Sequence, residues 1–171
     1  DAPHTIPPER ILVVDDPGYE SALDAAPPTR AVTAPPSEDD LFLLIFTSGS
    51  TGLPKAVRCT QDRIGRTGAH VAAIAQLTDD DVVYAPLPFF HAASLFTGWA
   101  GAVSAGIPVA MRRRFSATGT VPDLRAFGAT LLTYTGKVLN YILSVPETDE
   151  DASVPLRLAI GNEASEHDIR E

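Results

Sequence analysis

Residues 47–55 read TSGSTGLPK, and they lie between two apolar stretches, 41–46 and 56–60, that favour β-strands. Glycine permits positive φ angles and close approach of the backbone to a ligand, and successive amide groups in such a turn can surround an anion. Lys55 adds a compact positive charge suited to phosphate oxygens. The stretch is therefore suited to a phosphate-binding loop between two strands, although from these residues alone the turn of an ordinary hairpin is the favoured interpretation.

Two better-known glycine motifs do not fit this loop. Its glycines and lysine are not spaced as in GxxxxGK[ST], and a strand rather than a helix is expected to follow. The GxSxG pattern of serine hydrolases is absent as well. A hydrolase that uses Ser48 or Ser50 with His91 is a second alternative, but the strand–turn–helix context that such a nucleophile needs is missing.

Charge is distributed unevenly along the 171 residues, whose formal net charge is −9. Residues 41–142 carry nine basic and five acidic side chains, whereas both flanks are strongly acidic. A cationic centre in an acidic protein suits a small polyanion such as a nucleotide, and the absence of a basic domain argues against nucleic acid as a partner. No apolar run approaches the length of a membrane span. The single cysteine, Cys59, and the lack of a signal peptide favour a reducing, cytoplasmic location.

Strand-like and helical segments alternate after residue 40. We expect a buried strand at 41–46, a helix at 93–105, and a helix at 122–127 with a proline near its start. An ordinary turn, in which Asn162 tolerates a left-handed φ, is one interpretation of residues 161–163. The other expected strands are 56–60, 82–85, 107–111, 129–133 and 156–160, with helices at 61–76 and 137–143. This order predicts an α/β fold with a mostly parallel sheet and βαβ crossovers.

The first 40 residues are expected to form a separate acidic segment. It contains a short strand at 11–14, a helix at 19–26 and a linker rich in proline. The core domain is then predicted to occupy residues 41–171.

The loop and the segments downstream resemble the adenylate-forming (AMP-binding) superfamily, which includes acyl-CoA synthetases, adenylation domains of peptide synthetases and luciferases. Residues 86–91, PLPFFH, resemble the Pro-Leu-aromatic-His segment of that family. The segments at 98–99, 113–117, 127–130, 134–137 and 161–163 resemble its long- and very-long-chain fatty-acid branch, which is related to fatty-acid transport proteins, and look most like an actinobacterial fatty-acyl-CoA ligase. The resemblance covers about residues 40–171 and implies a fragment of the large N-terminal domain.

The resemblance implies an ATP-dependent acid–thiol ligase. A fatty-acid carboxylate attacks the α-phosphorus of ATP, pyrophosphate leaves, and the thiol of coenzyme A displaces AMP from the acyl-adenylate. ATP and Mg²⁺ are the implied cofactors, and coenzyme A is a co-substrate. A fatty-acid–AMP ligase or another acid-adenylating enzyme is the alternative, and so is a non-catalytic nucleotide-binding fragment, because the loop alone does not separate them.

The resemblance also implies roles for particular residues. His91 is the expected catalytic residue, beside the reacting carboxylate and α-phosphate. Phe96, Trp99 and Gly136 are the expected acyl-pocket residues. The nucleotide-binding residues are expected to be Thr47, Ser48, Gly49, Ser50, Thr51, Gly52, Lys55, Gly161, Asn162 and Glu163. The Mg²⁺-binding Glu and the catalytic lysine of the family belong to motifs that are not in this sequence, so we expect this chain alone not to turn over.

Three consecutive arginines, Arg112 to Arg114, follow an expected strand. A solvated edge is the favoured interpretation. Contact with the phosphates of coenzyme A is one alternative, and peripheral contact with an anionic lipid surface is the other.

Overall fold

The computed structural model describes residues 7, 14–27, 34–47 and 54–170. The chain divides into two compact units, residues 1–35 and 36–171. The described part of the first unit contains one short helix, α1 (Tyr19–Asp24), none of whose side chains is buried. The strand predicted at 11–14 lies outside the described residues except for Val14, which is in a turn.

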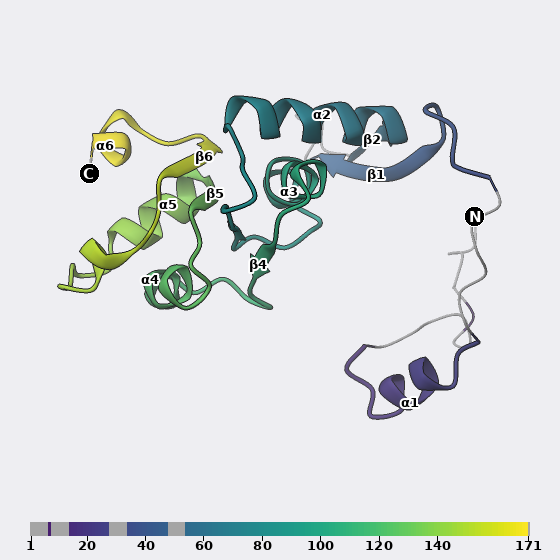
Figure 1. The fold of residues 1–171 in the computed structure, drawn as a ribbon, viewed down its shortest axis with the longest axis horizontal. Helices are drawn as coiled ribbons and strands as arrows, with labels where there is room; N and C mark the ends of the chain where they lie inside the picture. The colour runs from purple at the N-terminus through teal and green to yellow at the C-terminus, as the bar shows by residue number, and fades with distance from the viewer. Residues whose placement is uncertain (1–6, 8–13, 28–33, 48–53, 171) are drawn as a thin grey trace. The chain divides into compact units, whose positions relative to one another are not determined.

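A four-stranded parallel sheet forms the centre of the second unit (Figure 1). Its strands are β3 (Val83–Ala85), β4 (Val109–Met111), β5 (Leu131–Thr135) and β6 (Leu158–Asn162), in the order β4-β3-β5-β6. Val83 pairs with both Val109 and Leu131, and Leu131 pairs with Leu158. The predicted α/β class with a mostly parallel sheet is confirmed.

Helices cover both faces of this sheet because side chains alternate along each strand. One core cluster contains Val83 and Leu131 together with Ala75, Ala102 and Ile107, which belong to or follow the helices α2 (Gln61–Ile74) and α3 (Ala100–Ala105). The other cluster contains the next residues of the same strands, Tyr84 and Leu132. This second cluster also includes Ala110, Leu124 and Ala129. Leu124 belongs to the helix α4 (Ala117–Ala126), and Ile142 of the helix α5 (Gly136–Leu143) packs against the cluster.

A separate antiparallel hairpin precedes the parallel sheet. It consists of β1 (Leu41–Thr47) and β2 (Lys55–Thr60), which pair with each other and with no other strand in the described part of the chain. The strand predicted at 41–46 is confirmed, but the prediction that it is buried is wrong, because Leu41, Leu44 and Phe46 are 47%, 46% and 68% exposed. A continuous apolar run shows that both faces of a strand are suited to burial. It does not show whether other helices or strands of the chain pack against both faces.

The helix predicted at 93–105 begins with a wider turn. Residues Ala93–Trp99 form a π-helical segment, η2, before α3 continues to the left-handed Gly106. The predicted start of the next helix is also wrong: α4 begins five residues earlier, where the Ser116 hydroxyl accepts a hydrogen bond from the Gly119 amide at 3.1 Å. Pro122 therefore lies inside the helix, because the serine cap fixes the start.

The remaining elements are short. A 3-10 turn, η3 (Asp151–Ser153), interrupts the acidic loop, and α6 (Glu166–Arg170) follows β6. The strand β6 extends through Asn162, and the left-handed residue that follows it is Glu163, with φ +64°. Among the described residues, no helix combines the length and the apolar character needed to cross a membrane.

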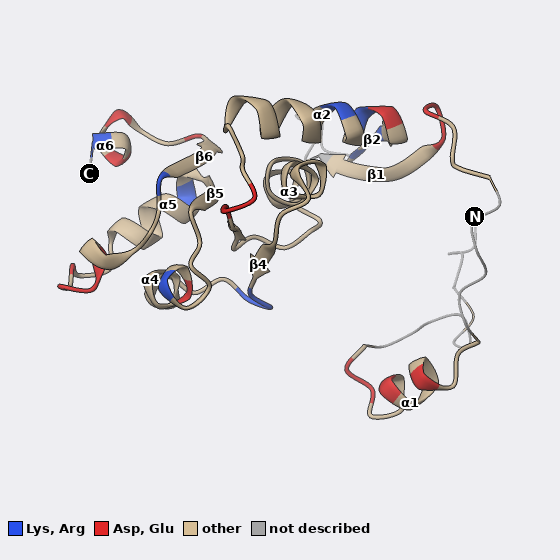
Figure 2. Ribbon diagram, in the orientation of Figure 1, with Lys and Arg blue, Asp and Glu red and all other residues tan. Residues whose placement is uncertain are grey.

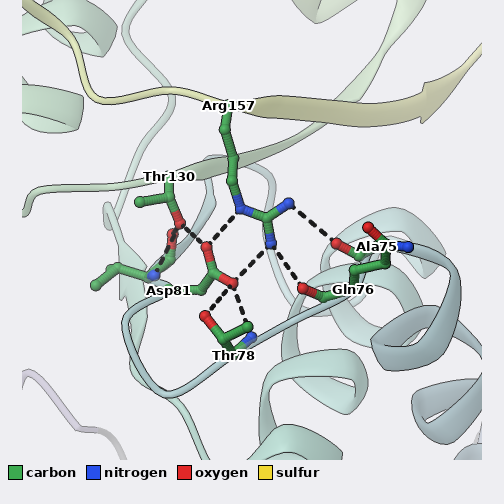
Figure 3. A network of polar contacts seen from close by, with 7 residues as sticks. Ala75, Gln76, Thr78, Asp81, Thr130 and Arg157 are labelled. Atoms are coloured by element: carbon green, nitrogen blue, oxygen red, sulfur yellow. Dashed lines mark hydrogen bonds and ion pairs between the residues drawn. The ribbon is translucent and has the colours of Figure 1, made fainter.

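Asp81 is the centre of a polar network that joins the starts of three strands (Figure 3). Its carboxylate is 3% exposed and accepts hydrogen bonds from Arg157, from the Thr130 hydroxyl at 2.6 Å and from the Thr78 amide at 2.8 Å. The guanidinium of Arg157 also donates to the carbonyls of Ala75 and Gln76, just after α2. The hydrogen bonds from Arg157 hold the pKa of Asp81 well below its usual range, and those from Thr130 and Thr78 add to the effect.

The three arginines after β4 are exposed, and Arg112 also takes part in a polar contact with α4. Arg112 forms an ion pair with Asp123, whose carboxylate also accepts the Tyr84 hydroxyl at 2.6 Å. Burial, reinforced by this bond, raises the pKa of Tyr84. The preference for a solvated edge agrees with the exposure of all three arginines, although the side chain of Arg112, 39% exposed, is also held by its ion pair.

Candidate functional site

The order of the parallel strands locates a ligand crevice. From β3 the chain crosses to β4 on one side, and from β5 it crosses to β6 on the other. Open α/β sheets bind ligands at such a reversal, outside the carboxyl ends of the two neighbouring strands. The segment 86–91 leaves β3 at this point, and Gly136 follows β5 directly.

A cavity of about 430 Å³ opens beside this edge of the sheet. Its walls come from the hairpin, from α2, from η2 and from the ends of β5 and β6. The lining residues are Ile45, Val57, Cys59, Arg63, Thr67, Ala92, Ala93, Phe96, Thr97, Tyr134, Ile160, Gly161 and Asn162. Phe96, predicted for the acyl pocket, thus shares one cavity with Gly161 and Asn162, predicted for the nucleotide.

The two ends of the predicted phosphate loop lie side by side. Thr47 is the last residue of β1 and pairs across the hairpin with Lys55, the first residue of β2. Lys55 is exposed. The predicted binding residues Ser48, Gly49, Ser50, Thr51 and Gly52 lie outside the described residues. The alternatives of a hairpin turn and a phosphate loop are therefore compatible, because the loop connects an antiparallel pair.

His91 stands at the start of the helix that forms one wall of the cavity. Its backbone amide donates to the Pro88 carbonyl at 2.9 Å, and its Nδ1 accepts a hydrogen bond from the Ala93 amide at 3.2 Å. Because Nδ1 uses its lone pair in this bond, the neutral ring carries its proton on Nε2. The half-buried imidazole can therefore present a hydrogen-bond donor at Nε2.

Two glycines let the ends of β5 and β6 approach closely. A Cβ atom on Gly136 would overlap the carbonyl of Glu163, and one on Gly161 would overlap the carbonyl and ring of Tyr134. Gly136 is buried against this backbone and does not line the cavity. Glu163 is exposed, and only its neighbours Gly161 and Asn162 reach the cavity wall.

Trp99 joins the hairpin to the helix that follows His91. Its ring stacks on Phe42 with centroids 6.1 Å apart and meets Phe89 edge-on at 6.4 Å. It does not line the cavity, whereas Phe96, one turn earlier, does. The assignment of Trp99 and Gly136 to the acyl pocket stays a prediction.

Sequence reasoning missed three polar residues of the cavity, Arg63, Thr67 and Tyr134. Arg63 and Thr67 lie four residues apart and hence on one face of α2. That spacing is visible in the sequence, but it becomes informative only once the hairpin is known to fold against this helix.

The described residues offer no cage for a metal ion. They contain no group of three or more His, Cys, Asp or Glu side chains that could hold one. The cavity wall itself carries one charged side chain among its described residues, that of Arg63.

The parallel sheet and its reversal point define an α/β protein with a cavity, the candidate ligand site, at the strand ends. Residues 3–171 match the family described as AMP-binding enzyme, and the chain belongs to this family. It is 43% identical over 165 residues to a steroid-22-oyl-CoA synthetase of Rhodococcus jostii, covering 95% of this chain and 30% of that protein. It is 40% identical over 156 residues to a medium/long-chain fatty-acid–CoA ligase of Mycobacterium tuberculosis, covering 91% and 31%. The chain spans about a third of the length of these curated relatives.

Solved structures show the same fold. The inhibitor-bound N-terminal domain of FACL13 from Mycobacterium tuberculosis matches with a TM-score of 0.74 and 25% identity, over 89% of this chain and 38% of that one. ATP-bound MatB from Rhodopseudomonas palustris matches with a TM-score of 0.71 and 25% identity, over 84% of this chain and 28% of that one. These matches confirm the fragment of an adenylate-forming N-terminal domain that the sequence predicts.

Proposed function

We propose that the protein containing this chain is an ATP-dependent acid–thiol ligase, which adenylates a fatty acid or a similarly apolar acid and transfers the acyl group to coenzyme A. The observation that supports this most strongly is the cavity, which gathers Phe96, Gly161 and Asn162 at the strand ends of a sheet belonging to the AMP-binding family. The names of the relatives, a steroid-22-oyl-CoA synthetase and a fatty-acid–CoA ligase, favour a large apolar acyl group.

The nucleotide is proposed to bind at the end of the hairpin. The loop residues Thr47 to Gly52 would surround the β- and γ-phosphates with amide and hydroxyl donors, and Lys55 would add a positive charge. Because Thr47 and Lys55 are paired, the lysine is held at the base of this loop. Gly161, Asn162 and Glu163 would lie beside the adenine.

His91 is proposed to act where the carboxylate approaches the α-phosphate. Attack brings two anions together, and a fixed donor between them lowers the repulsion. The hydrogen bond to Nδ1 fixes the ring and leaves the Nε2–H as that donor. The reaction needs positioning and charge neutralisation more than a protein nucleophile.

The acyl chain is proposed to enter the cavity between α2 and η2. Phe96, Ile160 and Val57 supply apolar contact area there.

No step is assigned to Mg²⁺, because the described residues contain no ligand cluster for it. A cytoplasmic location is likewise a proposal, favoured by the single cysteine of the chain.

Product analysis of the full-length protein tests this function. The protein is incubated with ATP and a panel of fatty and sterol acids, with and without coenzyme A, and acyl-adenylate, acyl-CoA, AMP and pyrophosphate are measured. The proposal expects acyl-CoA only when coenzyme A is present. Accumulation of acyl-adenylate whether or not coenzyme A is added would support an acid–AMP ligase instead, and no product with any acid would support a non-catalytic nucleotide-binding protein.

A further inference from the structure

The cavity is mostly apolar, but its wall carries one positive charge. Arg63 is the charged side chain among the described lining residues, and no lining residue is an acid. The wall also contains uncharged polar groups, among them Thr67, Tyr134 and Asn162. A purely hydrocarbon acyl group would leave a guanidinium at this wall without a polar partner on the ligand.

Arg63 makes no hydrogen bond or ion pair through its guanidinium with any residue that the structure describes. Its backbone amide alone is engaged, by donating to the Thr60 hydroxyl at 3.2 Å. The carboxylate next to it, Asp62, is already paired with Arg66 at 2.6 Å on the outer face of the helix. The helix supplies no second acid in its first turn to neutralise Arg63.

The position of Arg63 in α2 strengthens the positive potential. It is the third residue of the helix, at the end where the helix dipole is positive. In Figure 2 the ribbon is coloured for basic residues on β2 and near the start of α2, where an acidic residue also lies. Arg63 is exposed, so water solvates its guanidinium in the free protein. A ligand that covers this part of the wall would displace that water and would have to supply an oxygen acceptor in its place.

We propose that Arg63 determines acyl specificity by binding an oxygen acceptor carried on the acyl group away from the reacting carboxylate. The favoured substrates are then apolar acids with a second oxygen function, a hydroxyl or a second carboxylate. This inference rests on the proposed acid-activating function and deepens it, because it assigns the substrate class to one residue of the cavity. The apolar wall supplies most of the contact area for either substrate. Between two acids of equal chain length, the guanidinium favours the one that carries the second oxygen function.

The test compares three acids of equal chain length on the full-length protein: dodecanoic acid, ω-hydroxydodecanoic acid and dodecanedioic acid. The variants are Arg63→Met, which keeps the length of the side chain without its charge, and Arg63→Lys. Arg66→Met is the matched control, because it removes one positive charge from the outer face of the same helix. The readouts are kcat/KM with each acid and, without ATP, the shift in Tm that each acid causes.

We expect Arg63→Met to lower the preference for the oxygenated acids over dodecanoic acid by about tenfold or more, as for the loss of a hydrogen bond to a charged group. Arg63→Lys should retain part of the preference, and Arg66→Met all of it. A loss confined to the diacid identifies a carboxylate as the preferred group, and a loss with both oxygenated acids identifies any oxygen acceptor.

Other outcomes would overturn the inference. An equal loss with all three acids would place Arg63 at the reacting carboxylate, and a change only in the KM for coenzyme A would place it at that co-substrate. An unchanged preference in Arg63→Met would remove the role altogether. If no acid is adenylated by the unmodified protein, the proposed function fails. The Tm shifts then still decide whether Arg63 distinguishes the acids.

Discussion

Arg157 and Asp81, 76 positions apart in the sequence, meet through two parallel contacts. The Nε of Arg157 lies 2.7 Å from Oδ1 of Asp81, and its Nη2 lies 2.6 Å from Oδ2. Asp81 precedes β3 and Arg157 precedes β6, so this pair fixes the starts of two strands relative to each other (Figure 3). Such a planar two-point contact is stronger and more directional than a single ion pair.

Replacing the buried carboxylate should destabilise the protein clearly. In Asp81→Asn the hydrogen bonds from Arg157 and Thr130 lose their charged acceptor, while Arg157, with a side chain 39% exposed, can still reach water. We expect the free energy of unfolding to fall by about 2–3 kcal/mol, below the full cost of breaking a fully buried pair. Urea unfolding of the full-length protein measures this change.

A matched exposed pair provides the control for that variant. Asp62 and Arg66 are also joined at 2.6 Å, but Arg66 is 79% exposed. Asp62→Asn should therefore lower the free energy of unfolding by no more than about 0.5 kcal/mol. If both variants lose the same free energy of unfolding, the burial of Asp81 does not strengthen its ion pair.

Acid should remove the contribution of Asp81 in a defined range. Its hydrogen bonds lower the pKa of the folded carboxyl below the ordinary value of 3.8, so folding favours the ionised form. The stabilisation is therefore complete above about pH 5 and is lost progressively as the pH falls through about 4 and below. The difference in unfolding free energy between the unmodified protein and Asp81→Asn should be constant from pH 5 to 7 and should shrink below pH 4. A difference independent of pH would exclude this assignment.

The close approach of β5 and β6 predicts a strong effect at Gly161. A methyl group there would overlap the Tyr134 carbonyl and ring, so Gly161→Ala should displace the end of β6 and lower both stability and activity. Gly65→Ala is the control, because a Cβ at this position in α2 would meet nothing within 4 Å. That change should stabilise the helix by about 0.5–1 kcal/mol. Thermal unfolding of both variants and acyl-CoA formation decide the comparison.

Two substitutions at His91 separate its structural role from its chemical one. Asn can accept the Ala93 amide through its side-chain oxygen, as Nδ1 does at 3.2 Å, but it lacks the imidazole donor. We expect both His91→Asn and His91→Ala to lower kcat about 10²-fold or more, and His91→Asn to keep the unmodified Tm. A fully active His91→Asn would reduce His91 to a helix cap.

Lys55→Ala should weaken ATP binding and lower the efficiency of adenylation. Removal of the charge beside Thr47 is expected to raise the KM for ATP and to lower kcat/KM about tenfold or more, because the lysine would contact phosphate oxygens. Arg58→Ala, three residues along the same strand, is the control and should change neither value. Initial rates at varied ATP concentration give both constants, and an unaltered Lys55→Ala enzyme would remove the lysine from the nucleotide site.

Much of the fold could be predicted from the sequence, because local rules decide it. Thr60 caps α2 as its position before Gln61 suggests, with its hydroxyl accepting the Arg63 amide, and Gly106 adopts the left-handed φ expected at a helix end. The parallel strands follow from the alternation of apolar runs with helices. The family follows from the TSGSTGLPK loop and PLPFFH.

What could not be predicted depends on contacts between distant segments. The cavity needs Ile45 of the hairpin, Arg63 of α2 and Asn162 of β6 in one place, and no local pattern fixes that distance. The exposure of β1 depends on what covers it rather than on its composition. The left-handed conformation lies at Glu163 because β6 stays paired with β5 through Asn162, two residues beyond the predicted end of the strand.

Ala93–Trp99 form a π-helical turn, which contains more residues per turn than an α-helix. The number of residues in this segment therefore sets which side chains face the cavity. In an ordinary α-helix, each residue added or removed rotates all that precedes it by about 100°. Deleting one residue of the segment would let it adopt regular α-helical geometry. The deletion would also rotate His91, which precedes the segment, relative to α3 without replacing any other side chain. Single-codon deletions are thus a more direct route than substitutions to altered selectivity in this wall.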